Sequence, residues 1–134
     1  MENFEYAAFR KGLAANGSTF VNVMNTGVMA YMSRVNKVVL GARAMAANGD
    51  ITVDAGALAI ARAAKEMGRT VIVLGAVYKI SPTNALAEET AIEWGDPSQY
   101  VSYSDGQLVG HAKVRHAVSE FVPSDFVDVY ITNL

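Results

Sequence analysis

The most informative part of the sequence reads Lys37-Val38-Val39-Leu40-Gly41-Ala42-Arg43-Ala44-Met45-Ala46-Ala47-Asn48-Gly49-Asp50-Ile51-Thr52-Val53-Asp54-Ala55-Gly56. It opens with a short β-branched apolar run, which predicts a strand over 37–42 that is buried on both faces. Strands of this kind belong to parallel sheets that are covered by helices. In open α/β sheets, ligands gather at the carboxyl ends of the strands. We therefore expect any small-molecule site to lie within residues 41–56.

A helix and a further strand follow this stretch. Residues 55–67 have the clearest helical pattern in the chain, and Asp54 precedes them as the expected N-cap. Gly68 has the place of a C′ glycine. The apolar run 71–74 then predicts a second strand that is buried on both faces. Strand, helix and strand within about 40 residues form a βαβ unit, for which we expect a right-handed crossover.

The connection between the first strand and this helix has more than one interpretation. Residues 43–47 suit a single helical turn that ends at Asn48-Gly49. The same Asn48-Gly49 pair is typical of a hairpin turn. We expect a loop, because a helical pattern follows on its far side.

The residues before the central strand predict three elements. Residues 3–15 are expected to form a helix that stops at Asn16-Gly17. Residues 18–24 are rich in β-favouring side chains and predict a strand. Thr26 is a suitable N-cap for a second helix, whose apolar stripe runs to Val35.

The C-terminal part is harder to interpret. Residues 114–118 alternate between apolar and polar side chains, as an edge strand does. Pro123 suits the first turn of a helix. Residues 128–133 alternate again, so we expect a final strand with Val129 and Ile131 facing a core.

Composition restricts the class of protein. The chain has 134 residues, 51% of them hydrophobic, so we expect one α/β domain over residues 1–134 with a packed core. It has no cysteine, which excludes disulfides and thiolate catalysis in these residues. No apolar run approaches the ~20 residues that a membrane span needs. The first residues lack the pattern of a signal peptide, so we expect a cytoplasmic protein without a membrane partner.

Charge is distributed unevenly. Residues 1–79 carry nine Lys/Arg and five Asp/Glu, a balance of +4, whereas residues 80–134 carry two and eight, a balance of −6. Residues 85–94 are expected to form a short acidic helix within the second part. No basic stripe typical of a nucleic-acid binder is present, so we expect no direct contact with nucleic acid.

Motifs for catalysis or cofactors are absent from the sequence. It contains neither a Gly-x-Gly-x-x-Gly nor a phosphate-binding P-loop motif. His111 and His116 are five residues apart, which suits no paired metal ligands, so we expect no metal and no cofactor. Asp50 and Asp54 are four residues apart and could share a face, but a turn residue and a helix cap are the simpler explanation, which we prefer.

Residues 75–82 leave the second strand at its carboxyl end and contribute polar side chains there. Ser81 has no histidine close by in sequence, which argues against a nucleophile. Together with the polar residues of 41–56, this loop completes the set of candidate ligand- or partner-binding residues. They are Arg43, Asn48, Asp50, Asp54, Tyr78, Lys79 and Ser81.

Several short strings resemble a known family. They are Met32-Ser33-Arg34-Val35-Asn36-Lys37-Val38 running into Gly41, Ala47-Asn48-Gly49, Leu58-Ala59-Ile60-Ala61, Ala63-Ala64-Lys65, Tyr78-Lys79-Ile80-Ser81-Pro82, Phe121-Val122-Pro123 and Ile131-Thr132-Asn133. The chain is similar over residues 5–134 to the beta subunits of eukaryotic translation initiation factor 2B. The string from Met32 is fairly specific to that subunit. The others are shared with the alpha and delta subunits and with related sugar-phosphate isomerases, such as methylthioribose-1-phosphate isomerase.

The resemblance implies a regulatory role rather than catalysis. Proteins of this kind form the regulatory core of the guanine nucleotide exchange factor for initiation factor 2, while other subunits catalyse the exchange. The implied partners are the sister alpha and delta subunits, the catalytic subunits and the alpha subunit of initiation factor 2, whose phosphorylation blocks exchange. The implied fold is a Rossmann-like, mostly parallel sheet with helices on both faces. The implied state is an oligomer in the cytoplasm.

Two positions depart from the isomerases. Those enzymes carry a catalytic aspartate in a Gly-Ala-Asp-Arg string, where this chain has Gly41-Ala42-Arg43-Ala44. Arginine does not act as a general acid or base near neutral pH. Asp54 lies near the place where a phosphate would sit and would compete for the same amides. The alternative function is that of a sugar-phosphate isomerase relative or of a sugar-phosphate- or nucleotide-binding domain. In its form without turnover, Arg43 and Lys79 hold the phosphate.

The chain is also shorter than the family pattern. It has no counterpart of the family's N-terminal helical domain, of the first strand or strands of the sheet, or of a closing helix. Residues 18–24 must then pair directly with 37–42 or leave an exposed sheet edge. We therefore expect this chain to self-associate or to be marginally stable.

Overall fold

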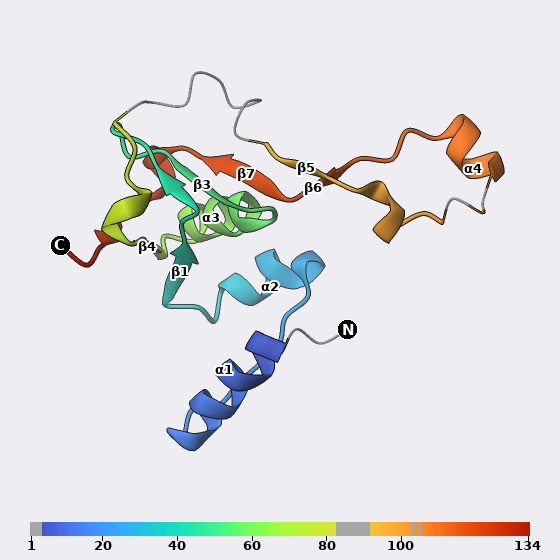
Figure 1. The fold of residues 1–134 in the computed structure, drawn as a ribbon. Coiled ribbons are helices and arrows are strands. Elements are labelled where there is room, and N and C mark those ends of the chain that lie inside the picture. The colour runs from blue at the N-terminus through green and yellow to red at the C-terminus, as the bar shows by residue number, and fades with distance from the viewer. Residues whose placement is uncertain (1–3, 83–91, 103, 105) are drawn as a thin grey trace.

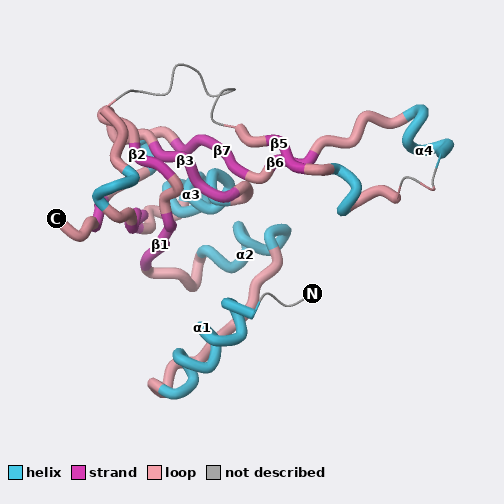
Figure 2. The backbone as a smooth tube through the Cα atoms, viewed as in Figure 1, coloured by secondary structure: helices cyan, strands magenta, loops and turns pink. Residues whose placement is uncertain are grey.

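The computed structural model describes residues 4–82, 92–102, 104 and 106–134. Figures 1 and 2 show a body of sheets around helix α3 (Ala57–Glu66) and an N-terminal helix that stands apart from it. A long excursion, made by residues 94–102 and 106–117, extends from the body before the chain returns to it. The N-terminal helix is α1 (Phe4–Ala15), as the sequence predicts. Strand β1 (Lys37–Gly41) lies in the body and confirms the central strand.

A three-stranded parallel sheet is the core of the fold. Its order is β1, β4 (Thr70–Leu74), β8 (Val129–Ile131), and both neighbouring pairs are parallel. Helix α3 lies between β1 and β4 in the chain, so the predicted strand–helix–strand unit is confirmed. The α/β fold class with a parallel sheet is therefore confirmed as well.

Helix α3 packs on one face of this sheet. Its alanines Ala61 and Ala64 are fully buried, because small side chains let the helix approach the strands closely. Gly68 ends the helix with φ +64°, as expected for a C′ glycine. The buried apolar residues of the structure lie on this side of the parallel sheet and in the adjoining hairpin: Met32, Val38, Leu40, Ala42, Met45, Ile51, Val53, Ala61, Ala63, Ala64, Val71, Val73 and Val122.

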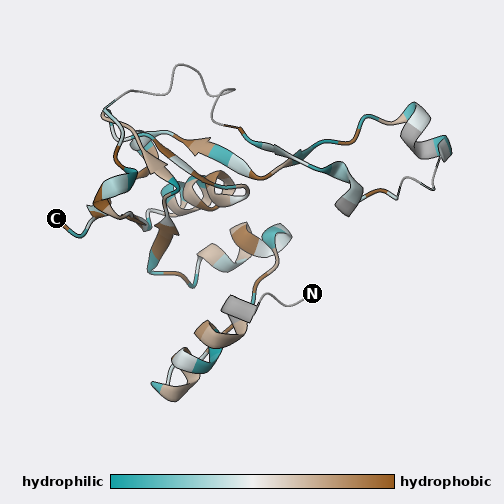
Figure 3. Ribbon diagram, viewed as in Figure 1, coloured by the Kyte–Doolittle hydropathy of each residue, from teal (hydrophilic) through white to brown (hydrophobic). Residues whose placement is uncertain are grey.

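The second face of the parallel sheet is exposed in the described residues. Burial alternates along β1, so that Val38 and Leu40 are buried while Val39 is 57% exposed. The prediction that the strands at 37–42 and 71–74 are buried on both faces is therefore wrong. Val129 and Ile131 are also exposed, which contradicts the expectation that they face a core. Figure 3 shows how hydrophobic β1 is although one of its faces is uncovered.

A second, antiparallel sheet follows β1 directly. Its order is β2 (Ala44–Met45), β3 (Ile51–Asp54), β7 (Ser119–Val122). Strands β2 and β3 form a hairpin closed by Asn48-Gly49, so the expected loop is wrong and the hairpin alternative is correct. Gly49 has φ +90°, a conformation that glycine adopts without strain and that the turn requires.

The segment between α1 and β1 departs from the prediction. Residues 18–24 form no strand, because none of the three sheets in the described part of the chain places a partner strand beside them. A 3₁₀ turn at Asn25–Gly27 then leads into helix α2 (Val28–Met32), which packs against α3. The second helix is thus present after Thr26, although it is short.

The C-terminal part confirms some short elements and changes others. Most of the expected helix at 85–94 lies outside the described residues, and its last residue belongs to strand β5 (Trp94–Gly95). Strand β6 (His116–Ala117) pairs with β5, in agreement with the predicted edge strand. Pro123 precedes a 3₁₀ turn at Ser124–Phe126 rather than an α-helix.

Three further short elements lie among the described residues. A 3₁₀ turn at Pro97–Gln99 and helix α4 (Gly106–His111) lie beyond the β5–β6 ribbon, at the far end of the excursion in Figure 1. A 3₁₀ turn at Val77–Lys79 follows β4. Among the described residues, no helix is both long and apolar enough to cross a membrane.

Candidate functional site

Arg43 lies directly after β1 and is paired with two carboxylates. Its Nε is 2.7 Å from Oδ1 of Asp54, and its Nη1 is 3.0 Å from Oε2 of Glu93. Asp54 is the last residue of β3 and lies beside Arg43 at the end of the hairpin that is away from its turn. Glu93 directly precedes β5. The sequence predicts Arg43 and Asp54 as site residues but does not predict that they bind each other.

The two ion pairs determine what Arg43 can bind. The hydrogen bond from Arg43 to Asp54 raises the pKa of the arginine above its ordinary value, although partial desolvation opposes the shift. The guanidinium therefore stays positively charged. The carboxylates of Asp54 and Glu93 together carry two negative charges against its one positive charge. A phosphate at Arg43 would be repelled by the carboxylates of Asp54 and Glu93. This arrangement disfavours an anion site.

The loop after β4 lies against the same part of the chain. Lys79 donates from Nζ to the carbonyl oxygen of Ala42 at 2.8 Å, one residue before Arg43. The backbone N–H of Ser81 donates to the carbonyl oxygen of Met45 at 2.7 Å. Tyr78, in contrast, is 81% exposed and projects from the loop. The structure thus brings Arg43, Asp54 and the loop 77–81 to one edge of the molecule.

Asn48 and Asp50 lie at the other end of the hairpin, in its turn. Asn48 donates from Nδ2 to Oδ2 of Asp50 at 2.7 Å, and Oδ1 of Asp50 accepts from the backbone N–H of Ser124 at 2.8 Å. The hydroxyl of Tyr130 on β8 donates to the carbonyl oxygen of Gly49. These bonds tie the hairpin turn to the C-terminal strand. Partial burial raises the pKa of Tyr130, and the nearby charge of Asp50 adds to the shift.

The N-terminus of α3 holds a carboxylate that the sequence analysis missed. Oε1 of Glu120 accepts from the backbone N–H groups of Gly56 and Leu58, each at 2.7 Å. Asp54 is therefore not the N-cap, and this prediction is wrong. Glu120 is more than 60 residues away in sequence and reaches the helix because β7 pairs with β3. It takes the backbone donors that a phosphate would use at this helix.

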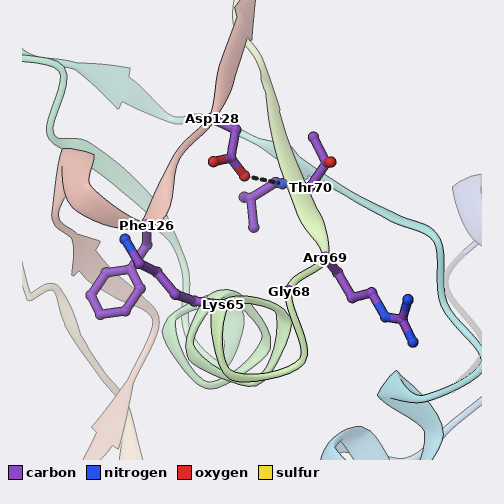
Figure 4. Close-up of a pocket in the computed structure, with 7 residues that line it drawn as sticks. Lys65, Gly68, Arg69, Thr70, Phe126 and Asp128 are labelled. Atoms are coloured by element: carbon purple, nitrogen blue, oxygen red, sulfur yellow. Dashed lines mark hydrogen bonds between the residues drawn. The ribbon is translucent and has the colours of Figure 1, made fainter.

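A pocket of about 260 Å³ lies at the amino ends of β4 and β8 (Figure 4). It is lined by Lys65, Gly68, Arg69, Thr70, Val71, Phe126 and Asp128. Oδ2 of Asp128 accepts from the N–H of Val71 at 2.8 Å, and Lys65 lies over the ring of Phe126. Figure 4 shows Arg69 pointing away from Asp128. The pocket lies at the strand ends opposite those that lead to Arg43 and the loop 77–81, and the sequence analysis did not predict it.

Metal binding has no support in the part of the chain that the structure describes. Within those residues, no group of three or more histidine and acidic side chains could hold an ion.

Comparison with known proteins identifies the family. The model of the initiation factor 2 subunit family matches residues 8–134. Translation initiation factor eIF2B subunit beta of Schizosaccharomyces pombe is 35% identical over 127 residues, which cover 95% of this chain and 32% of that protein. Ribose 1,5-bisphosphate isomerase of Pyrococcus furiosus is 29% identical over 123 residues, which cover 91% of this chain and 38% of that enzyme.

A solved structure supports the similarity to eIF2B beta subunits. A chain in the crystal structure of the tetrameric eIF2B-beta2-delta2 complex from Chaetomium thermophilum superimposes with a TM-score of 0.70 at 35% identity, covering 98% of this chain and 36% of that one. The chain thus spans about a third of the length of the relatives it matches. The resemblance to eIF2B beta subunits is confirmed. Because the family model spans almost every residue, the chain belongs to the initiation factor 2 subunit family.

Proposed function

We propose that this chain is a non-catalytic domain of an eIF2B-type translation initiation factor, and that it acts in assembly with sister regulatory subunits. Similarity to eIF2B beta over 95% of the chain supports a subunit of this factor. The similar structure is a complex of beta and delta subunits, which supports a delta-type partner. We further propose that residues 1–134 make up one α/β domain, which is partial relative to the family.

One observation carries the non-catalytic part of the proposal. Arg43 stands where the related isomerases are expected to carry an aspartate, and it is bound to Asp54 and Glu93. A guanidinium does not exchange protons near neutral pH. The carboxylate of Glu120 on the amides of α3 points in the same direction, because it would oppose a substrate phosphate.

The surface we propose for the sister subunit is the loop 77–81 at the carboxyl edge. Tyr78 is its most exposed residue, and Val77 and Ile80 beside it are also exposed apolar side chains. Bonds from Lys79 and Ser81 to the chain after β1 hold the loop against the body. An exposed tyrosine on a fixed loop, flanked by apolar side chains, has the character of an interface hot spot.

Capture by an immobilised delta-type eIF2B subunit tests this surface. We expect the chain to bind, and Tyr78→Ala to weaken binding about tenfold or more, as the loss of a hot-spot tyrosine does. Tyr100→Ala is the matched control, because Tyr100 is also largely exposed but lies in the excursion beyond β5. Equal loss in both variants, or no binding by the unaltered chain, contradicts the proposal.

Recognition of the alpha subunit of initiation factor 2 is a finer proposal with its own measurement. The same capture is repeated with that subunit, once phosphorylated and once unphosphorylated. A difference between the two forms places part of the phosphorylation sensor in this chain. Equal capture, or none, limits the chain to assembly with sister subunits and with the catalytic subunits.

Sugar-phosphate binding is the second candidate function. It is supported by the 29% identity to a ribose 1,5-bisphosphate isomerase. Thermal unfolding with and without ribose 1,5-bisphosphate tests it. We expect no shift in Tm, because the cation at position 43 is already paired. A saturable increase in Tm that Arg43→Ala abolishes would favour this candidate.

A further inference from the structure

Two Asn-Gly pairs occur in the sequence, Asn16-Gly17 and Asn48-Gly49, and each follows an alanine. Asparagine is a chemically labile residue. It is most labile before glycine, because no side chain of the glycine obstructs attack by the glycine nitrogen on the side-chain carbonyl carbon of the asparagine. Both pairs are therefore candidate sites of spontaneous deamidation.

Deamidation proceeds in two steps and needs only water as a co-reactant. In the first step, the glycine nitrogen forms a bond to Cγ of the asparagine, the Cγ–Nδ2 bond breaks, and ammonia leaves with the proton from the glycine nitrogen. In the second step, water opens the resulting cyclic imide at one of its two carbonyl carbons. The product is aspartate or isoaspartate, either of which carries a new negative charge. The first step requires the side-chain amide to turn one face of its plane toward the glycine nitrogen.

The backbone is closely alike around the two pairs. Gly17 and Gly49 both have a positive φ, of +74° and +90°. The N–H of each donates to the carbonyl oxygen of the alanine three positions earlier, at 3.0 Å in both cases. Asn16 and Asn48 are both exposed in this chain. Neither the backbone nor exposure to water therefore distinguishes the two pairs.

The side-chain amides of the two asparagines differ in their hydrogen bonds. Nδ2 of Asn48 donates to Oδ2 of Asp50 at 2.7 Å, and Oδ1 of Asn48 accepts from the backbone N–H of Asp50 at 3.1 Å. The carbonyl oxygen of Gly49 is held as well, by the hydroxyl of Tyr130. In the described part of the chain, the amide of Asn16 has no hydrogen-bond partner. Rotation of the amide therefore breaks two bonds at Asn48 and none at Asn16.

We propose that Asn16 is a site of spontaneous deamidation in this chain and that Asp50 protects Asn48 from the same reaction. Asp50 is itself fixed, because its Oδ1 accepts from the backbone N–H of Ser124 at 2.8 Å. Its carboxylate therefore cannot follow the amide of Asn48 as that amide turns. The protection depends on hydrogen bonds within the chain, so it persists whether or not further protein covers the hairpin turn.

Protection at position 48 preserves the hairpin turn. Aspartate at this position would place a carboxylate where Nδ2 of Asn48 now donates to Asp50, so two negative charges would face each other. Isoaspartate would lengthen the backbone in the turn that joins β2 to β3. Asn16, in contrast, directly follows α1 and belongs to none of the three described sheets, so its conversion leaves their pairing unchanged.

Mass spectrometry of the 134-residue chain, held in mildly alkaline buffer, measures both sites in one sample. Trypsin separates the two sites, because Asn16 lies within residues 12–34 and Asn48 within residues 44–62, and fragment spectra assign each mass gain to one asparagine. We expect Asn16 to convert at least about tenfold faster than Asn48, because its amide turns without losing a hydrogen bond. In concentrated urea, both should convert at similar rates, since each pair follows an alanine. Equal rates in the folded chain, or a difference that persists in urea, would overturn the proposal.

Two variants test the role of the bonds in the turn. Asp50→Ala should raise the rate at Asn48 to near that at Asn16, and an unchanged rate at Asn48 in the folded variant would overturn the proposal. Tyr130→Phe keeps Asp50 and should raise the rate at Asn48 by a smaller factor, because only the bond to Gly49 is lost.

Asp125→Ala is the matched control for these variants. It removes an exposed carboxylate from the 3₁₀ turn at Ser124–Phe126 and leaves Asp50 in place, so neither rate should change. Circular dichroism checks that each variant is folded. If Asp50→Ala does not fold, Tyr130→Phe and the unaltered chain still decide the outcome. The measurement needs no partner subunit, so its result is independent of the proposed function.

Discussion

Among single residues, Arg43 shows what the sequence could and could not predict. The hairpin register places Ala44 opposite Thr52, which brings Arg43 close to Asp54 across the open end. A hairpin turn at Asn48-Gly49 brings these two residues near each other but does not predict the ion pair, because the register extended by one step pairs Arg43 with Val53. Glu93 is 50 residues away and reaches Arg43 only through the tertiary fold, so no local pattern predicts it. Asn48 and Asp50, predicted as site residues, bind each other and the C-terminal segment.

Tyr130 gives a prediction for stability against pH. Its pKa in the folded chain is raised above the ordinary value of 10.0, so the folded state retains the phenolic proton more strongly than the unfolded state. The stabilisation is complete below about pH 10 and is lost as the pH rises through the raised pKa. Tyr130→Phe should cost about 0.5–1.5 kcal/mol at pH 7, because the bond to Gly49 is lost.

Urea denaturation of both chains between pH 7 and pH 11 checks this prediction. The difference in unfolding free energy between the unaltered chain and Tyr130→Phe should shrink above about pH 10, since phenylalanine does not ionise. Taking the difference removes the titration of other groups. A constant difference across this range would show that Tyr130 does not contribute to the pH dependence.

At the level of helices and strands, the sequence pattern of a strand predicts it correctly only where a neighbouring strand is available to pair with it. Strands β1 and β4 pair with each other and were found at the predicted positions. Residues 18–24 have a comparable β-favouring composition but no neighbouring strand, so they do not form one. Local sequence also does not reveal how many faces of a strand are covered. That is why the prediction of burial on both faces failed for β1.

Helix α3 gives a prediction for its N-terminus. Glu120→Ala leaves the amides of Gly56 and Leu58 without their acceptor and should lower the unfolding free energy by about 1–3 kcal/mol. Glu120→Gln keeps an acceptor oxygen but removes the charge at the helix N-terminus, which should cost only about 0.3–1 kcal/mol.

Urea denaturation measures both variants of Glu120. Glu66→Ala is the control, because Glu66 is exposed at the other end of the same helix and should change stability by less than about 0.5 kcal/mol. If the glutamine and alanine variants of Glu120 lost the same stability, the carboxylate would not act through its hydrogen bonds to the backbone.

For the whole molecule, the family is predicted by the resemblance to eIF2B subunits and not by the periodicity of apolar residues. The strings around Met32 and Tyr78 predict the family, and the match over residues 8–134 confirms it. The chain spans only about a third of the relatives' length, so an exposed sheet face is physically consistent with a domain that meets further protein surface. The pattern within the chain does not predict which surface meets which subunit, because periodicity separates an exposed face from a buried one but does not identify the partner.

Isothermal titration of the chain with a delta-type eIF2B subunit would measure the proposed assembly itself. We expect saturable binding with a defined stoichiometry and a negative heat-capacity change, because apolar surface around Tyr78 becomes buried. Tyr78→Ala should weaken this binding, whereas Tyr100→Ala should not. An absence of heat at concentrations well above micromolar, together with saturable binding of ribose 1,5-bisphosphate, would contradict the assembly role and favour a ligand-binding domain.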